Sequence, residues 1–331
     1  MICRKVNFKA RSSPGLYFYY ALIKIASMAF FCYAPNMQLS IIFALVSLVA
    51  YAFGDFFTQK SVRKIGTIKN LFFFGIIGAL ILTPFIIVNK VYRTLNNIHN
   101  IWPIILFAIV IILANLFDFE ALKKGRFAVI QPVYSIELPF IIILSILVLG
   151  EKIYLVQWLS IILIFIGLVL TVSNKFSLQN ILSHKNLEKG AFWALLSAAA
   201  LALSALLITI SSRATSPLLI AWIAQMALCI FGFCYTLFSG TLKELLNHFK
   251  KNKTTVLLQG ALQDLAIVSF AFATLYGKLS IAAPISENYV VLSVFIGVVI
   301  NKDRIDRHQK IGVGLSIVGL LILSILDKGM H

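Results

Sequence analysis

Residues 125–153 read GRFAVIQPVYSIELPFIIILSILVLGEKI, an apolar run with a polar cluster after its proline and a charged end. A second version of this run occupies residues 277–305, at an offset of 152 positions. Without a gap, the offset pairs the identical residues Ala121/Ala273, Gly125/Gly277, Pro132/Pro284, Ile153/Ile305, Gln157/Gln309, Gly167/Gly319 and Leu168/Leu320. Residues 43–47 also resemble residues 193–197, at an offset of 150. The sequence therefore indicates an internal duplication, with a small insertion or deletion between the two registers.

Composition places the chain in a lipid bilayer. Of its 331 residues, 60% are hydrophobic and 12% are charged, which leaves too little polar surface to cover a water-soluble globule of this size. A membrane helix needs about 20 apolar residues, and the chain contains continuous apolar runs of that length. Segments of a membrane β-barrel would be about 10 residues long and would alternate apolar with polar positions. We therefore predict an all-α membrane protein.

Apolar windows predict five spans in each copy. They cover residues 39–59, 67–88, 101–122, 127–149 and 154–173, then 190–210, 217–239, 254–276, 279–300 and 309–326. Because five is odd, the second copy must enter the membrane upside down relative to the first, which is the inverted-repeat plan of many secondary transporters. The predicted fold is ten transmembrane helices in two inverted five-helix repeats, residues 37–173 and 186–327. The connections, of which 174–189 and 240–253 are the longest, leave no room for an extramembrane domain.

Residues 1–36 fit three interpretations. Four basic residues precede an apolar run, 16–34, that carries Lys24 in its middle. As a signal peptide the segment is disfavoured by Pro35, which directly follows the run. As an extra N-terminal helix it has a lysine at mid-membrane, where a charge is costly. As an upstream extension of the reading frame it ends at Met37, which opens directly onto the first span.

The net charge of +17 does not indicate a nucleic-acid partner. The lysines and arginines lie in short clusters between apolar runs and are typical of helix-end anchors. Connections after odd-numbered spans carry 18 of them, whereas those after even-numbered spans, with the tail, carry 6. By the positive-inside rule the odd-numbered connections are cytoplasmic and both ends of the ten-helix core are outside. An extra first helix would bring the basic N-terminus inside. We expect a multi-pass protein of the cell (inner) membrane.

A short motif ends the fourth span. Residues 149–152 read LGEK and are followed by Gln157 and Gly167. Together with the doubled five-helix unit and the proline upstream, this arrangement resembles the EamA-type families of the drug/metabolite transporter superfamily. The second copy departs from the pattern, because residues 301–304 read NKDR where the first copy has LGEK. A role shared by both loops is therefore not predicted.

The resemblance implies a ten-helix transporter with a substrate cavity between the repeats. Such proteins often export amino acids, amines or other metabolites by exchange or with protons. The resemblance also implies cytoplasmic ends, which the loop charges contradict for the core. For Glu151 and Lys152 themselves we predict a solvated pair at a helix end rather than a role in transport.

Six of the twelve acidic residues lie inside predicted spans. There a carboxylate costs roughly 2.5 to 3.5 kcal/mol on insertion scales, so each must face a cavity, a partner or a proton. These residues are Asp55, Asp118, Glu120, Glu137, Asp264 and Glu287. Asp118 and Glu120 have a structural explanation, because lysines follow both within a turn and Glu120/Lys124 is an i,i+4 pair. Asp55 lies about a turn from Lys60, which leaves a structural and a functional role equally open.

Glu137, Asp264 and Glu287 have no basic neighbour in the sequence and are the predicted functional carboxylates. A proline precedes each glutamate and frees a backbone carbonyl, which membranes tolerate where the carbonyl lines a cavity. The predicted substrate- or proton-binding set is Glu137, Glu287, Asp264, Ser135, Tyr134, Asn288, Tyr289, Gln263 and Asp55. Glu137 stands five residues after its proline and Glu287 three, which leaves a packing role open for one of them. Interhelical hydrogen bonding is the alternative for Gln263 and Asp264.

The charges inside the spans limit the substrate class. Lys and Arg occur only at the ends of the ten core spans, whereas a strongly anionic substrate needs paired cations. The predicted function is a secondary transporter, an exporter or exchanger, of an amine, an amino acid or another cationic or neutral small molecule. Proton coupling and a homodimer are left open. No cofactor or metal site is predicted, because the five histidines lie in loops or the tail and the four cysteines lack metal-ligand spacing.

Two other classes of function were weighed. A membrane-embedded enzyme such as an intramembrane aspartyl protease is disfavoured, because Gly54-Asp55 lacks the first glycine of the Gly-x-Gly-Asp motif. A non-transporting scaffold is disfavoured by three unpaired carboxylates at mid-membrane.

Overall fold

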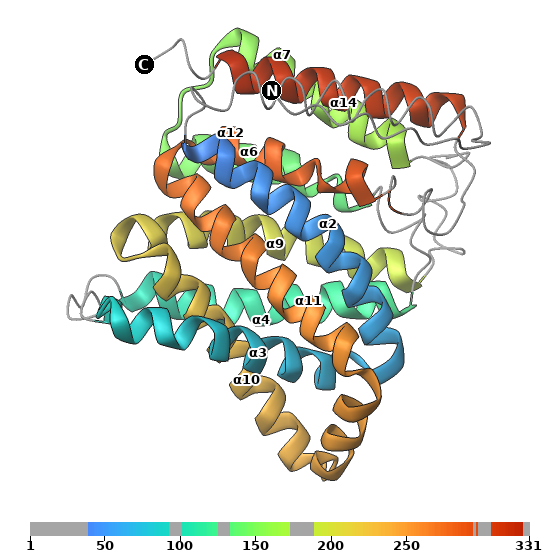
Figure 1. The fold of residues 1–331 in the computed structure, drawn as a ribbon. Coiled ribbons are helices and arrows are strands. Elements are labelled where there is room, and N and C mark those ends of the chain that lie inside the picture. The colour runs from blue at the N-terminus through green and yellow to red at the C-terminus, as the bar shows by residue number, and fades with distance from the viewer. Residues whose placement is uncertain are drawn as a thin grey trace, which may run out of the picture.

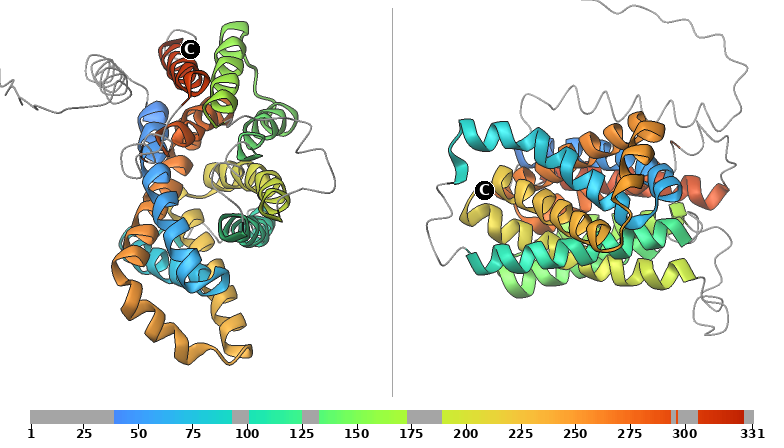
Figure 2. Two further views of the ribbon diagram at one scale, coloured as in Figure 1. Left: turned by 90° about the vertical axis from the view of Figure 1, so that its right-hand side faces the viewer. Right: turned by 90° about the horizontal axis from the view of Figure 1, so that it is seen from below.

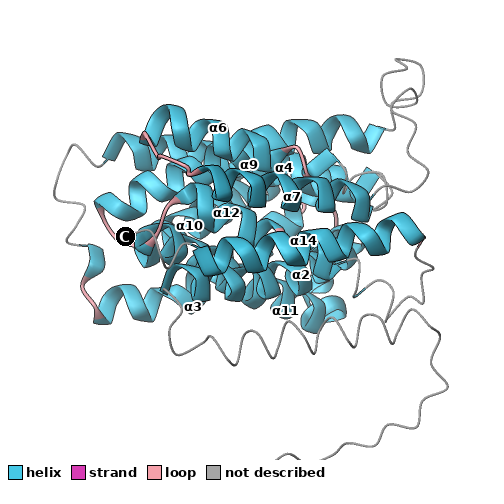
Figure 3. Cartoon of the chain, turned by 90° about the horizontal axis from the view of Figure 1, so that it is seen from above, coloured by secondary structure: helices cyan, strands magenta, loops and turns pink. Residues whose placement is uncertain are grey.

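The computed structural model describes residues 39–92, 101–124, 133–172, 189–293, 296 and 306–326. Within these residues every regular element is a helix and there is no strand (Figure 3). The predicted all-α class is therefore confirmed. The three interpretations of residues 1–36 lie outside the described residues, as do Pro132 and the second-copy loop at 301–304.

The helices follow one another along the two halves (Figure 1). The first half holds α2 (Leu39–Ile65), α3 (Thr67–Val88), α4 (Ile101–Lys124), α6 (Glu137–Leu149) and α7 (Leu155–Val172). The second half holds α9 (Lys189–Ala214), α10 (Pro217–Phe238), α11 (Leu242–Tyr276), α12 (Leu279–Glu287) and α14 (Arg307–Leu326). Among the described residues, 7 helices are long and apolar enough to cross a membrane, and α6 and α7 are shorter apolar helices. This set is compatible with ten spans.

Helices form here because a lipid-exposed chain must satisfy its backbone hydrogen bonds internally. Large apolar side chains on the outer surface face what would be lipid, for example Phe85 at 53% and Val88 at 77% exposure. Gly150 ends α6 in the left-handed conformation, with φ 64°, which glycine adopts without a Cβ penalty.

Helix α11 begins earlier than predicted. The predicted eighth span starts at residue 254, but the helix starts at Leu242 and has non-helical backbone only at Asn252 (φ −125°, ψ 19°). The added segment packs its apolar residues Leu245 and Phe249 against α3. It also places Glu244 against Lys69, which lowers the pKa of the Glu244 carboxyl. The four lysines of this segment are typical of a connection rather than of a membrane span, which is why its helix has no signal in the hydropathy.

Each helix packs chiefly against a helix from the other half. The pairs are α2 with α11, α4 with α9, α3 with α10, and α7 with α14, whereas α6 packs mainly against α9 and α12 mainly against α2. Figure 1 shows α7 beside α14 at the top and α2 beside α11 across the front, and the views of Figure 2 agree. Exchanging the two halves in chain order converts the pair of α2 and α11 into that of α9 and α4, and the pair of α6 and α9 into that of α12 and α2. The pairs α3 with α10 and α7 with α14 stay unchanged. The packing is therefore what a two-fold relation between the halves requires.

Individual contacts also recur at positions related by the duplication. In each half an arginine Nε donates to a backbone carbonyl near the end of a neighbouring helix, Arg63 to Leu122 at 3.4 Å and Arg213 to Thr274 at 3.1 Å. In each half a glutamine Oε1 accepts from a backbone N–H three residues earlier, Gln157 from Tyr154 at 3.0 Å and Gln309 from Asp306 at 2.9 Å. The two halves thus share local structure as well as sequence.

Small residues bring α7 and α14 into backbone contact. A Cβ on Gly167 would collide with Ser316 and Gly312 of α14, and a Cβ on Gly319 would collide with Ser160 and Ile164 of α7. Close helix approach through glycine and serine is typical of membrane helices, where packing replaces the hydrophobic effect.

This contact predicts a difference between two neighbouring glycines of α14. Gly312→Ala should lower the free energy of unfolding by about 1–3 kcal/mol, because its Cβ would lie 2.7 Å from the carbonyl oxygen of Gly167. Gly314→Ala is the matched control, since nothing lies within 4 Å of its Cβ and alanine favours the helix. Thermal unfolding of both variants in one detergent checks the prediction. Equal midpoints would contradict the close approach of the two helices.

Candidate functional site

Two helices are interrupted at positions related by the duplication. Before α6 the chain turns at Ser135 and Ile136, and the Ile136 N–H bonds the carbonyl of Val133 at 3.1 Å. After α12 it turns at Asn288, whose N–H bonds the carbonyl of Ile285 at 3.3 Å. The offset of 152 carries Ile136 onto Asn288 and Val133 onto Ile285. Both halves therefore contain the same break.

The two glutamates flank these breaks from opposite sides. Glu137 is the first residue of α6 and Glu287 the last of α12. The offset pairs Glu137 with Tyr289 and Glu287 with Ser135. One glutamate thus follows its break and the other precedes its break. This explains why the two glutamates stand at different distances from their prolines and still line the same cavity.

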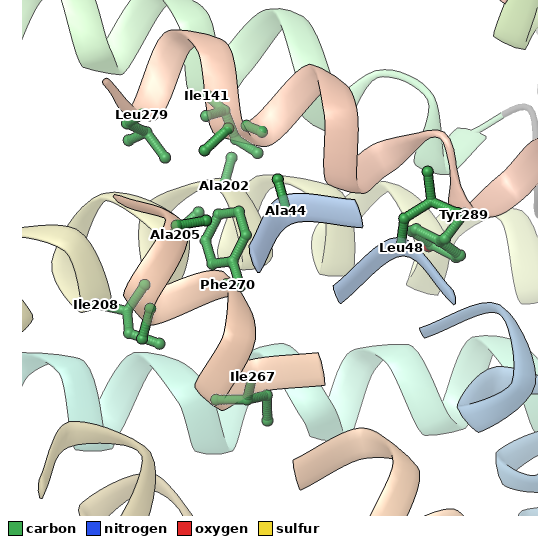
Figure 4. Close-up of a cluster of buried hydrophobic side chains, with 14 of the residues drawn as sticks. Ala44, Leu48, Ile141, Ala202, Ala205, Ile208, Ile267, Phe270, Leu279 and Tyr289 are labelled. Carbon is green, nitrogen blue, oxygen red and sulfur yellow. The ribbon is translucent and has the colours of Figure 1, made fainter. Parts of the chain in front are cut away.

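A cavity of about 110 Å³ lies between the halves at the level of these breaks. Its polar lining consists of Tyr51, Asp55, Asn115, Asp118, Tyr134, Glu137, Ser204, Gln263, Glu287 and Tyr289. Apolar residues complete the wall, among them Ala205, Ile208, Ile267 and Phe270. Figure 4 shows these four side chains within the buried hydrophobic cluster. Of the described residues that line it, four are carboxylates and none is a lysine, arginine or histidine.

The four carboxylates differ in their partners. Asp55 Oδ1 accepts a hydrogen bond from Gln263 Nε2 at 2.8 Å, and Asp118 Oδ1 accepts one from the Tyr134 hydroxyl at 2.5 Å. No described residue donates a hydrogen bond to the carboxylate of Glu137 or of Glu287. Both are nevertheless part of the cavity wall. A buried carboxylate of this kind needs a proton or a cation.

The tyrosines add aromatic surface next to the carboxylates. The rings of Tyr51 and Tyr289 lie 5.7 Å apart between centroids, at an angle of 47°. Tyrosine faces attract cations, and more strongly where water is excluded. The cavity thus combines negative charge, aromatic faces and apolar walls.

The structure brings six of the nine predicted site residues to the cavity. They are Asp55, Tyr134, Glu137, Gln263, Glu287 and Tyr289. The lining does not include Ser135 or Asn288, which lie buried at the two helix breaks. Nor does it include Asp264, whose Oδ1 accepts a hydrogen bond from Gln225 Nε2 at 2.6 Å.

Asp264 sits against a glycine of α3. A Cβ on Gly78 would lie 2.6 Å from Asp264 Oδ2 and from Gln225 Cγ. The carboxylate therefore lies between α3, α10 and α11 rather than with Glu137 and Glu287. Adjacent residues on a helix face different sides, and the sequence did not show that Gln263 rather than Asp264 faces the cavity.

Four polar lining residues were missed from the sequence, namely Tyr51, Asn115, Asp118 and Ser204. The structural explanation of Asp118 was wrong, because the nearby lysines pair with Glu120 instead. Lys124 Nζ lies 2.6 Å from Glu120 Oε2 and Lys123 Nζ lies 3.9 Å from its Oε1. The i,i+3 spacing of Asn115 and Asp118 on one helix face was an available signal.

Glu151, which follows α6, is buried rather than solvated as predicted. The Glu151 side chain is 6% exposed, and its carboxylate accepts hydrogen bonds from the backbone N–H groups of Leu279 and Ser280, both at 2.9 Å. These residues begin α12, so the carboxylate caps a helix of the other half. Arg213 lies 3.4 Å from the same carboxylate. The interpretation of Glu151 and Lys152 as a solvated pair is therefore wrong.

Comparison with known families matches both halves of the chain. The model of the EamA-like transporter family covers residues 38–173 and 188–325. The chain belongs to the EamA-like transporter family. It is therefore a multi-pass membrane transporter of the drug/metabolite transporter superfamily, as the motif and the duplication predicted, and EamA-like proteins are transporters rather than enzymes.

Two further similarities describe the repeat and the fold. An uncharacterised protein of Methanocaldococcus jannaschii is 32% identical over 139 residues, which is 42% of this chain and 100% of that protein. A relative of about the length of one half thus exists as a separate chain. One solved protein crystal structure matches 88% of this chain and 99% of its own, with a TM-score of 0.68 and 15% identity. At this identity the match shows the fold alone.

The cavity predicts selective labelling of two serines on α9. Ser204→Cys should react with a small methanethiosulfonate reagent, because Ser204 lines the cavity. Ser197→Cys is the matched control, since Ser197 is fully buried and its Oγ lies 3.5 Å from the carbonyl of Ala114. Mass spectrometry of both variants, in a background without native cysteines, measures the difference. Equal protection of the two positions would contradict a solvent-reachable cavity.

Proposed function

We propose that the protein is a secondary transporter, an exporter or exchanger, of a small amine, amino acid or other cationic or neutral metabolite. The supporting observation is a cavity between the two halves with four carboxylates and no basic residue among the described lining. Such a wall repels anions and favours molecules with positive charge. The apolar and aromatic remainder of the wall suits the carbon skeleton of a metabolite. We place the protein in the cell (inner) membrane.

The proposed mechanism is alternating access between two inverted repeats. An odd number of spans per repeat inverts the second copy, and the observed helix pairing is compatible with a two-fold relation. In inverted repeats, the binding site lies near the bilayer midplane at discontinuous helices. The interruptions next to Glu137 and Glu287 fit that position.

In this mechanism Glu137 and Glu287 hold the positive charge of the substrate or the coupling proton. They are the lining carboxylates to which no described residue donates a hydrogen bond, so a ligand or proton is needed to neutralise them. Asp55 and Asp118 are held in place by Gln263 and Tyr134 and contribute negative potential. Asp264 holds Gln225 outside the cavity, and we assign it a structural role.

Charge-removing variants test this assignment in proteoliposomes. Glu137→Gln and Glu287→Gln should each reduce transport of a cationic substrate by about 10- to 100-fold, since a charge-assisted hydrogen bond contributes about 1.5–3 kcal/mol. Substrate is identified first with a panel of amines, amino acids and nucleosides. If a glutamate carries only the coupling proton, its variant should lose pH-driven net transport and keep substrate exchange.

Two further variants serve as controls for these measurements. Glu244→Gln removes an exposed partner of Lys69 in the first turn of α11, outside the cavity, and should transport like the wild type. Asp264→Asn keeps an oxygen for Gln225 and should have a much smaller effect than the glutamate variants. Wild-type rates for Glu137→Gln and Glu287→Gln at every pH from 5.5 to 8 would show that both are packing residues.

A further inference from the structure

The cavity carboxylates are distributed in a way that narrows the substrate class. Each half supplies one glutamate to which no described residue donates a hydrogen bond. These are Glu137 from α6 and Glu287 from α12. The two aspartates come from α2 and α4 and already accept hydrogen bonds. Two negative groups, on two different helices, are thus left for a ligand.

A compact metal ion does not fit this distribution. Within the described part of the chain, no three histidine, cysteine, aspartate or glutamate side chains come together as metal ligands. Ca²⁺ takes about six to eight oxygen ligands, and Mg²⁺ keeps several of its waters when one or two carboxylates bind it. The two glutamates come from different helices and different halves, so each can bind a different charged group of one ligand.

The remaining wall fits a hydrocarbon between those charges. Phe74, Phe107, Ile111, Ile267 and Phe270 line the same cavity. Such side chains contact methylene groups favourably, at about 0.8 kcal/mol for each CH₂ removed from water. Tyr51 and Tyr289 lie beside the carboxylates and present faces that attract ammonium groups.

We propose that the cavity binds an organic cation with two separated positive charges, such as an alkyl diamine. This inference rests on the proposed transport function and specifies its substrate. One ammonium pairs with Glu137 and the other with Glu287, so that each half of the protein binds one end of the ligand. A substrate of this kind also draws the two halves together, because both helices are held by one molecule.

The test compares 1,4-diaminobutane with butylamine, which has the same carbon chain and only one ammonium group. Purified full-length protein in vesicles should transport the diamine with a half-saturation concentration at least 10-fold lower. In Glu137→Gln and in Glu287→Gln this preference should fall to about 1, because one ammonium loses its partner while the other glutamate still binds a monoamine. Glu244→Gln, outside the cavity, should keep the preference.

The outcomes separate this inference from the proposed function. Equal half-saturation concentrations for both amines in the wild type would overturn the two-charge ligand and leave a transporter of single cations. A preference that persists in both glutamate variants would overturn the assignment of the two ends. If the protein transports none of the amines, amino acids and nucleosides in the panel, the proposed function is overturned as well.

A second inference rests on the contacts of Glu151. Arg213 pairs with the Glu151 carboxylate and also donates a hydrogen bond to the backbone carbonyl of Gly277 at 2.8 Å. Lys278 Nζ donates to the carbonyl of Lys152 at 3.1 Å. The loop after α6 is therefore bound to the end of α9 and to the connection between α11 and α12, which belong to the other half.

The geometry assigns a role in transport to the cluster of Glu151, Arg213 and Lys278. These contacts close the cavity at one membrane face. Helix α12 begins at the residues that Glu151 caps and ends at Glu287, about 12 Å further along its axis. Separating Glu151 from α12 frees the start of the helix whose other end lines the cavity. Alternating access then requires that this contact breaks when the cavity opens on that face.

Cysteine labelling tests the closure. In a Ser204→Cys background, Glu151→Ala should raise the labelling rate by a membrane-impermeant reagent at least 10-fold from the face that carries residues 150–154. That face is identified by labelling Lys152→Cys, since Lys152 is exposed. The matched control Glu244→Ala breaks an ion pair away from the cavity and should not change labelling. An unchanged rate, or an equal increase from both faces, would show that Glu151 only stabilises the fold.

Discussion

The constraint on which this structure depends is the cost of a carboxylate in a largely apolar protein. Asp55 and Asp118 have hydrogen-bond donors in the cavity wall, and carboxylates outside the cavity have partners too. Glu120 pairs with lysines at the end of α4, Asp264 accepts from the Gln225 amide, and Glu151 binds the first N–H groups of α12. Glu137 and Glu287 receive no such donor from the described residues. The proposed site is thus the place where a ligand or a proton would neutralise the charge.

The interrupted helices make this arrangement stable. A turn in the middle of a span exposes backbone polar groups, which is tolerated only where protein or a water-filled cavity surrounds them. At Asn288 the side chain Nδ2 donates to the carbonyl of Pro284 at 2.9 Å, next to the break. The same turns place Glu137 at the start of α6 and Glu287 at the end of α12. Backbone and side-chain polarity are therefore concentrated in one layer of the molecule.

The sequence predicted what depends on periodicity and internal repetition. Hydropathy located the helices, and the offset of 152 placed the polar clusters that contain Glu137 and Glu287 at related positions of the two copies. It could not show which side of a helix faces the cavity, so Asp264 was included and Asp118 left out. Nor could it find the partner of Glu151, because Leu279 is 128 residues away. Such errors follow from tertiary contacts that have no local signal.

The two copies of the duplicated unit share some contacts and have diverged in others. Arg63 and Arg213 occupy related positions, and each donates to a backbone carbonyl of a neighbouring helix. The loops that follow the fourth and ninth spans have diverged, from LGEK to NKDR. A perfect inverted repeat would make the two access states equal in free energy, because exchanging the halves converts one state into the other. In the proposed mechanism, divergence at Glu151 would remove that equality and favour the state in which its contacts with α12 form.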